Sequence, residues 1–152
     1  MHTGKILAMD QSDRFESVDA DLLVIFEQLR RREPIFHTPE FGSTVAEFGN
    51  VMAPGYWEVG ASGRRYSREF VLRMFENNPP VNAATEEWET SGFGCRRIGP
   101  DTYLMTYTLR QKMRVTRRCT IWQGNAERWR ILYHQGTVVA AEQDDVLPSP
   151  IE

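Results

Sequence analysis

The spacing of hydrophobic positions changes about halfway along the chain, from a helical period to the alternation typical of strands. In the first half, apolar residues recur every three or four positions, which predicts a helix over residues 21–32. Its apolar face carries Leu22, Ile25, Phe26 and Leu29. Asp19 or Asp21 can cap its start, and Pro34 ends or kinks it.

Two further helices are predicted before residue 80. Thr44 and Glu47 have the spacing of a capping box, so a second short helix begins there and ends at Pro54-Gly55. Ser67 is a good N-cap for a third helix that runs to Asn77. Between these two helices, residues 56–59 and 64–66 predict a short strand and its return.

The second half of the chain is dominated by strands. Long strands are predicted over residues 85–98, 102–110, 114–122 and 129–139. Gly92 and Gly94 interrupt the first of them and indicate a bend or bulge. Turns are expected at Gln111-Lys112 and at residues 123–126. Helices followed by antiparallel strands predict an α+β fold.

The same pattern divides the chain into three parts. Residues 1–20 predict a loose N-terminal arm, residues 21–139 a single domain, and residues 140–152 a flexible tail. In the 102–110 strand, one face carries Tyr103, Met105, Tyr107 and Leu109, while Leu104 lies on the other. Because both faces are partly apolar, we expect helices to cover one side of the sheet and a cavity or partner subunit to cover the other.

Composition narrows the classes of partner. A formal net charge of −3 argues against nucleic acid, which needs clustered basic residues. No apolar run reaches the roughly 18 residues of a membrane span, and residues 1–10 lack the apolar core of a signal peptide, so a cytoplasmic location is expected. Cys95 and Cys119 do not have a metal-binding spacing, and no metal or other cofactor is expected.

His134 and Glu58 are the candidate acid/base residues. A histidine titrates near neutrality, and a carboxylate on a mostly apolar strand is a candidate general base. Two structural alternatives remain open: His134 as a buried neutral residue, and Glu58 as the partner of a buried Arg117 or Arg118. The four tryptophans are expected in the core or a dimer interface.

Strand register decides which side chains accompany His134. If Trp122 lies opposite Arg128, His134 pairs with Thr116 and shares a face with Arg118, Thr120 and Trp122. A two-residue turn at 111–112 adds Tyr107 and Met105 to that face. Gln135 points to the opposite face unless a bulge intervenes.

Two segments together resemble the nuclear transport factor 2-like superfamily, which includes SnoaL-like polyketide cyclases and ketosteroid isomerases. They are Trp57-Glu58-Val59-Gly60-Ala61-Ser62-Gly63-Arg64, and Thr116-Arg117-Arg118-Cys119-Thr120-Ile121-Trp122 with Leu132-Tyr133-His134-Gln135-Gly136-Thr137. The resemblance spans roughly residues 20–139. More narrowly, the chain resembles a branch of this superfamily, a group of small bacterial proteins described as a domain of unknown function. It implies a cone in which three helices close the concave side of a bent sheet, often with dimerisation through the sheet.

The resemblance leads to two functional hypotheses. The first is a homodimer that binds a small hydrophobic organic molecule inside the cone, with His134 and Glu58 catalytic and the remaining site residues shaping the pocket: Tyr66, Tyr107, Arg118, Trp122 and Gln135. Its chemistry would be cofactor-free isomerisation, cyclisation or dehydration, although no residues match the acid-and-tyrosine oxyanion hole of ketosteroid isomerases. The second is a non-catalytic module that binds a ligand or a protein.

Overall fold

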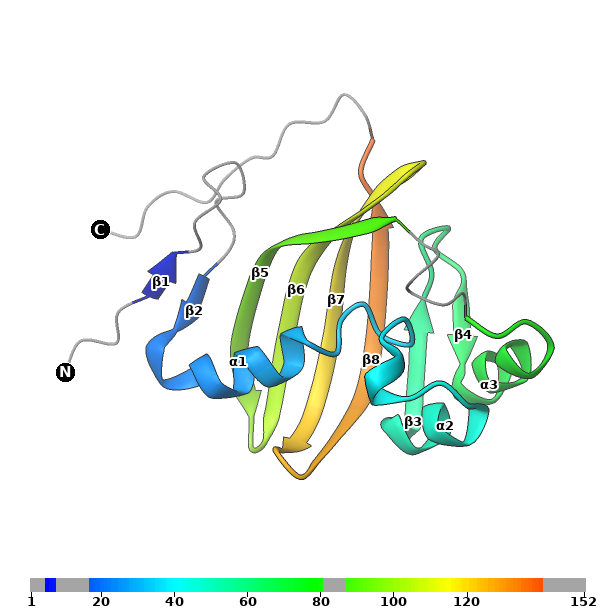
Figure 1. The fold of residues 1–152 in the computed structure, drawn as a ribbon, viewed down its shortest axis with the longest axis horizontal. Helices are drawn as coiled ribbons and strands as arrows, with labels where there is room; N and C mark the ends of the chain where they lie inside the picture. The colour runs from blue at the N-terminus through cyan, green and yellow to red at the C-terminus, as the bar shows by residue number, and fades with distance from the viewer. Residues whose placement is uncertain (1–4, 8–16, 81–86, 141–152) are drawn as a thin grey trace.

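The computed structural model describes residues 5–7, 17–80 and 87–140, and Figure 1 shows their arrangement. The helices are α1 (Leu23–Arg30), α2 (Val45–Val51) and α3 (Arg68–Asn77), with 3-10 turns at Ala20–Leu22 and Pro39–Phe41. The strands are β1 (Lys5–Leu7), β2 (Ser17–Asp19), β3 (Met52–Val59), β4 (Arg65–Ser67), β5 (Trp88–Gly99), β6 (Thr102–Gln111), β7 (Arg114–Asn125) and β8 (Arg128–Val138).

The strands form one bent, unclosed sheet in the order β1-β2-β5-β6-β7-β8-β3-β4. Each of the long strands β5, β6 and β7 pairs antiparallel with the next strand along the chain. Strand β3 pairs with the other edge of β8 and runs parallel to it. Helix α1 lies across the concave face over β5, β6 and β7, and α2 and α3 lie beside β3 and β4 (Figure 1). This confirms the predicted α+β cone.

The predicted helices are confirmed, with one boundary corrected. The Ser67 hydroxyl accepts a hydrogen bond from the Phe70 amide and begins α3 as expected, and the Thr44 hydroxyl does the same for Glu47 in α2. However, Pro54-Gly55 does not end α2. The helix stops at Val51, and both residues lie within β3, where the register shift between Met52 and Trp57 accommodates a proline that cannot donate to a ladder.

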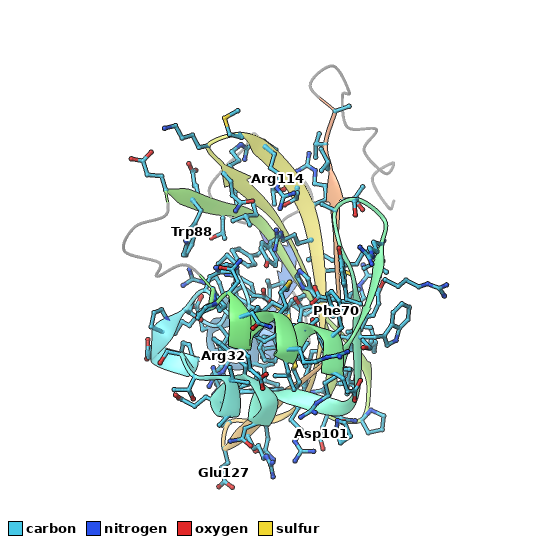
Figure 2. The ribbon with its side chains drawn as sticks, turned by 90° about the vertical axis from the view of Figure 1, so that its right-hand side faces the viewer. Arg32, Phe70, Trp88, Asp101, Arg114 and Glu127 are labelled. Atoms are coloured by element: carbon cyan, nitrogen blue, oxygen red, sulfur yellow. The ribbon has the colours of Figure 1, made fainter. Side chains whose placement is uncertain are left out.

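The strand turns lie close to their predicted positions. The bend in β5 is confirmed, because the pairing shifts between Ser91 and Gly94 and Gly92 has φ +64°. The β6–β7 turn is one residue later than expected, at 112–113, and the β7–β8 turn is restricted to 126–127. Asp101 and Glu127 mark the end of the sheet nearest the helices, while Trp88 and Arg114 mark the far end (Figure 2).

The structure describes part of the predicted arm and only residue 140 of the predicted tail. Part of the expected loose arm is ordered, because β2 pairs with β5 and the Val18 side chain is buried at the register partner of Cys95. The alternation in β2 was too short to be recognised in the sequence. Of the expected tail, residues 141–152 lie outside the described residues, as do residues 85–86 of the predicted first long strand.

The core lies between the concave face and the helices. Tyr103, Met105, Tyr107 and Leu109 are all buried there, as their alternation predicts. In β8 the alternation breaks, because Ile121 pairs with Tyr133 but Trp122 pairs with Ile131, which leaves Leu132 as an extra residue. Trp129 and Ile131 before this bulge, and His134 after it, are therefore all buried.

Gly124 provides a stability test of the β7–β8 connection. It has φ +132°, and a Cβ there would lie 2.0 Å from the Arg128 carbonyl oxygen. We expect Gly124→Ala to lower the free energy of unfolding by about 3 kcal/mol or more, because both the backbone conformation and the contact are unfavourable. Urea denaturation measures the change.

Gly55→Ala is the matched control. A Cβ on Gly55 meets nothing within 4 Å, so this variant should stay within about 1 kcal/mol of the parent protein. Equal stability of the two variants would contradict the tight approach of β7 to β8.

Candidate functional site

A buried carboxylate occupies the interior of the cone. Glu33 lies just after α1, at a cis peptide bond to Pro34, and is 4% exposed. Its carboxylate accepts hydrogen bonds from the Tyr107 hydroxyl at 2.7 Å and from the Trp122 Nε1 at 3.0 Å. Burial raises the pKa of Glu33, while these donors and Thr120 oppose the shift. The segment after α1 is thereby held against β6 and β7.

All the predicted site residues except Gln135 lie on the same face of the sheet, in one row or next to it. Register places Tyr66 opposite Glu58, Glu58 opposite His134, and His134 opposite Thr120. The His134 Nδ1 and the Thr120 hydroxyl are 2.8 Å apart. Arg118 pairs with Tyr107 and lies over Gly136, where its Nε donates to the Thr116 hydroxyl at 3.0 Å.

Burial controls the titration of the two acid/base candidates. Burial lowers the pKa of His134 to about 3, with smaller contributions from the positive charges of Arg118 and His37. Burial raises the pKa of Glu58, opposed by the neighbouring Tyr56 hydroxyl and the Arg118 guanidinium. His134 is therefore neutral at pH 7, and its Nε2 is buried without a hydrogen-bond partner among the described residues.

One positional expectation, the cross-strand partner of His134, differs from the structure. The partner of His134 is Thr120, and Thr116 instead pairs with Val138, because the β7–β8 turn and the Leu132 bulge shift the register by an even number of residues. The shared face is nevertheless the expected one. Gln135 lies on the opposite face, where its Oε1 accepts a hydrogen bond from the Tyr133 hydroxyl at 2.5 Å.

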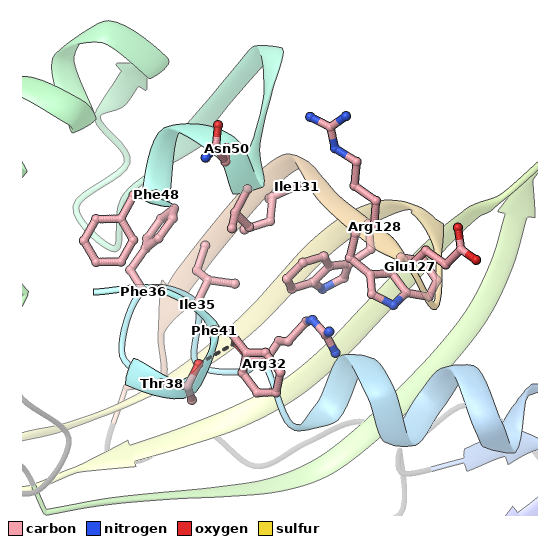
Figure 3. Close-up of a pocket in the computed structure, with 14 residues that line it drawn as sticks. Arg32, Ile35, Phe36, Thr38, Phe41, Phe48, Asn50, Glu127, Arg128 and Ile131 are labelled. Atoms are coloured by element: carbon pink, nitrogen blue, oxygen red, sulfur yellow. Dashed lines mark hydrogen bonds between the residues drawn. The ribbon is translucent and has the colours of Figure 1, made fainter. Parts of the chain in front are cut away.

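A pocket of about 250 Å³ opens beside this interior, between the segment of residues 32–51 and the strands β7 and β8 (Figure 3). Most of its wall is aromatic or aliphatic: Ile35, Phe36, Phe41, Phe48, Trp122, Trp129 and Ile131. Its polar side chains are Arg32, Thr38, Asn50, Glu127 and Arg128. Of the predicted site residues only Trp122 lines it; His134 and Glu58 do not.

The pocket wall is held in place by contacts on its far side. The Phe36 ring packs against Phe48 and Phe75, with ring centroids 5.4 and 5.1 Å apart. The Trp129 Nε1 donates to the Gln28 side-chain oxygen at 3.1 Å, and Trp122 is fixed by Glu33. Such a wall is preorganised for an apolar ligand.

Sequence reasoning did not identify Glu33 or most of the pocket residues. Glu33 follows three arginines, and a charged run at a helix end is ordinarily solvent-exposed. The residues between Ile35 and Phe41 have no periodicity that would place them against β8. An isolated acid directly before a proline, followed by an Ile-Phe pair, is the only local signal in this segment.

The described residues also bear on metal binding and on membrane insertion. Within residues 5–7, 17–80 and 87–140, no group of three or more His, Cys, Asp or Glu side chains is placed to hold a metal ion. Among the helices in the described part of the chain, none has both the length and the apolar character needed to span a bilayer.

Comparison by sequence finds no family model and no curated protein that matches the chain. Comparison by structure finds many matches. A DUF3225-family protein of unknown function from Pectobacterium atrosepticum is 18% identical with a TM-score of 0.58, and the match covers 80% of this chain and 94% of that one.

Two further solved structures are similar. A nuclear transport factor 2-like protein from Cytophaga hutchinsonii has 13% identity and a TM-score of 0.55, over 86% of this chain and 100% of the other. A cystatin-like fold protein from Burkholderia xenovorans has 14% identity and a TM-score of 0.58, over 80% and 94%. The chain therefore has the nuclear transport factor 2-like fold, as its sequence predicted.

Proposed function

We propose that the protein binds a small, largely aromatic organic molecule in the pocket between residues 32–51 and the strands β7 and β8. The observation that supports this most directly is the pocket itself, whose volume of about 250 Å³ and aromatic wall suit a ligand of one or two rings. Five rings line it, including two indoles that are already held by hydrogen bonds on their far side.

Binding without acid/base chemistry agrees best with the positions of the titratable groups. A general base has to reach the proton that it removes, directly or through one water. His134 and Glu58 do not line the pocket, and His134 is buried and neutral. The interior that a cone-bound substrate would occupy contains Glu33, Tyr107 and Trp122.

Acid/base catalysis is the second candidate, and one observation favours it. Glu58 and His134 are register partners, with Tyr66 and Thr120 on either side and Arg118 near enough to influence both charges. Burial raises the pKa of Glu58, and such a shift is common among catalytic carboxylates. This function requires a substrate to enter beside Glu58.

We further propose that the outer face of the sheet forms a homodimer. Register aligns Leu104, Ile121, Tyr133 and Trp57 as a continuous apolar row across four strands of that face. Trp57 is 44% exposed, and its ring packs edge-on against Tyr133. Leu104, Ile121 and Tyr133 are half-buried, and a partly exposed apolar row of this kind favours a partner subunit.

The pocket proposal can be tested with a blocking substitution. Asn50 is exposed on α2 at the pocket rim, so Asn50→Trp adds a large ring there without altering the core. We expect naphthalene-2-carboxylate or naphthalene-2-methanol to bind the parent protein 1:1 with a sub-millimolar Kd, and Asn50→Trp to weaken this about 10-fold. Isothermal titration calorimetry measures both.

Asn50→Ala is the control, because it removes the same amide and leaves the pocket open. Its affinity should match the parent protein. If neither naphthalene compound binds, or if both variants bind equally well, the pocket is not the ligand site.

His134 should make stability depend on pH. The unfolded chain takes up a proton as the pH falls below about 6.5, but folded His134 resists until pH about 3, so stability is lost over that window. Relative to His134→Asn, which can keep the contact with Thr120, the parent protein should lose about 2 kcal/mol between pH 7 and pH 5. Urea denaturation of both proteins at the two pH values gives this difference.

Parallel pH profiles for the two proteins would show that His134 is not held neutral. That result would return it to consideration as a titrating catalytic residue.

Trp57 tests the dimer. Light scattering after size-exclusion chromatography should give twice the monomer mass of 17.6 kDa, and Trp57→Glu should shift the species toward monomer because it places a charge in the apolar row. Met113→Glu, at a 90% exposed residue in the β6–β7 turn, is the control. A monomeric parent protein would contradict the proposal.

A further inference from the structure

We propose that the ligand is an organic anion whose carboxylate is bound by Arg32 while its ring system lies among the aromatic side chains, with Arg128 on the opposite rim adding to the positive charge of the pocket. This inference rests on the proposed function and specifies the chemical class that the pocket accepts.

The pocket differs in charge from the protein as a whole. The chain has a net charge of −3, yet the charged side chains of the wall are two arginines and one acid. Figure 3 shows the Glu127 carboxylate turned toward the outside at the rim. A locally positive cavity in an acidic protein favours an anionic ligand over a neutral or cationic one.

Arg32 is preorganised at the pocket. Its Nη1 donates to the Gln28 carbonyl oxygen at 2.5 Å, and its guanidinium carbon lies 4.3 Å from the centre of the Phe41 ring. These contacts fix the plane of the guanidinium but use only part of its donor capacity. Burial and the neighbouring Arg31 lower the pKa of Arg32, and the Glu40 carboxylate opposes them only in part. A ligand anion would offset the remaining unfavourable environment of this charge.

Other cations nearby are already neutralised. Arg31 pairs with Glu40 at 2.6 Å, and Arg30 pairs with Glu27 at 2.6 Å. Neither Arg32 nor Arg128 has an ion-pair partner in the described part of the chain. Arg128, at the start of β8, is exposed on the opposite rim from Arg32 (Figure 3).

The remaining donors of the wall are mostly committed. The Trp122 and Trp129 N–H groups donate to Glu33 and Gln28, and the Thr38 hydroxyl lies 3.5 Å from the Arg32 carbonyl oxygen. The two guanidinium groups are therefore the charged donors left for a ligand, together with the neutral Asn50 amide at the rim. A planar guanidinium fork matches the two oxygens of a carboxylate.

The test compares naphthalene-2-carboxylate with naphthalene-2-methanol, which share a ring system and differ in charge. Calorimetry on the full chain should show the carboxylate binding at least about 10-fold more tightly at low salt, with the difference shrinking at 0.3 M salt because the Arg128 side is exposed. Arg32→Gln should remove most of this preference, and Arg128→Gln should reduce it about 3-fold.

Arg30→Gln is the matched control, because it removes a cation of the same segment that does not line the pocket. It should keep the full preference. Since Arg32 also contacts α1 and Phe41, the folding of Arg32→Gln is checked by the indole N–H signals of its NMR spectrum. If that variant is unfolded, the exposed Arg128→Gln decides the outcome.

The outcomes separate this inference from the proposed function. Equal affinity for both naphthalene compounds would leave the pocket as a ligand site and overturn the anion class. A preference that survives in both Arg32→Gln and Arg128→Gln would also overturn it. Binding of neither compound would remove the proposed function itself.

Discussion

The buried carboxylate of Glu33 is the contact on which the arrangement of the cone depends. A carboxylate without donors in an apolar interior is strongly unfavourable, so the segment after α1 is stable in this position only with both donors in place. Those donors, Tyr107 and Trp122, come from β6 and β7, far along the chain. Their bonds close the concave face and place Ile35 and Phe36 where they form one wall of the pocket.

Trp122 connects the interior with the pocket. Its N–H holds Glu33, while its ring is part of the pocket wall. The other polar groups of the interior are His134, which lies against Thr120, and Glu58, which lies between His134 and Tyr66 in the row. The polar interior and the apolar pocket are therefore neighbours that share one residue. This separation is the reason that binding and acid/base chemistry are distinct proposals.

Much of the fold could be predicted because helix caps and strand alternation are local. The Ser67 cap and the alternating core face of β6 depend on residues that are close in sequence, and both are present as expected. The face shared by His134, Arg118 and Trp122 followed from the assumed register and is the one observed, since the true register differs from the assumed one by an even number of residues. The predicted end of α2 at Pro54 was wrong, because the long-range pairing of β3 with β8 makes Pro54 part of a strand and ends the helix earlier, at Val51.

By itself, the sequence determined the order of helices and strands, the bend at Gly92, and the resemblance to a cone fold, because each depends on local conformational preference and side-chain period. Only the tertiary structure decided the position of Glu33, the extra residue at Leu132, and therefore which aromatic rings surround the pocket. The position of Glu33 and the wall of the pocket depend on contacts between residues some 70 to 100 positions apart. The extra residue at Leu132 depends on the pairing of β8 with β7, which no local signal in the chain specifies.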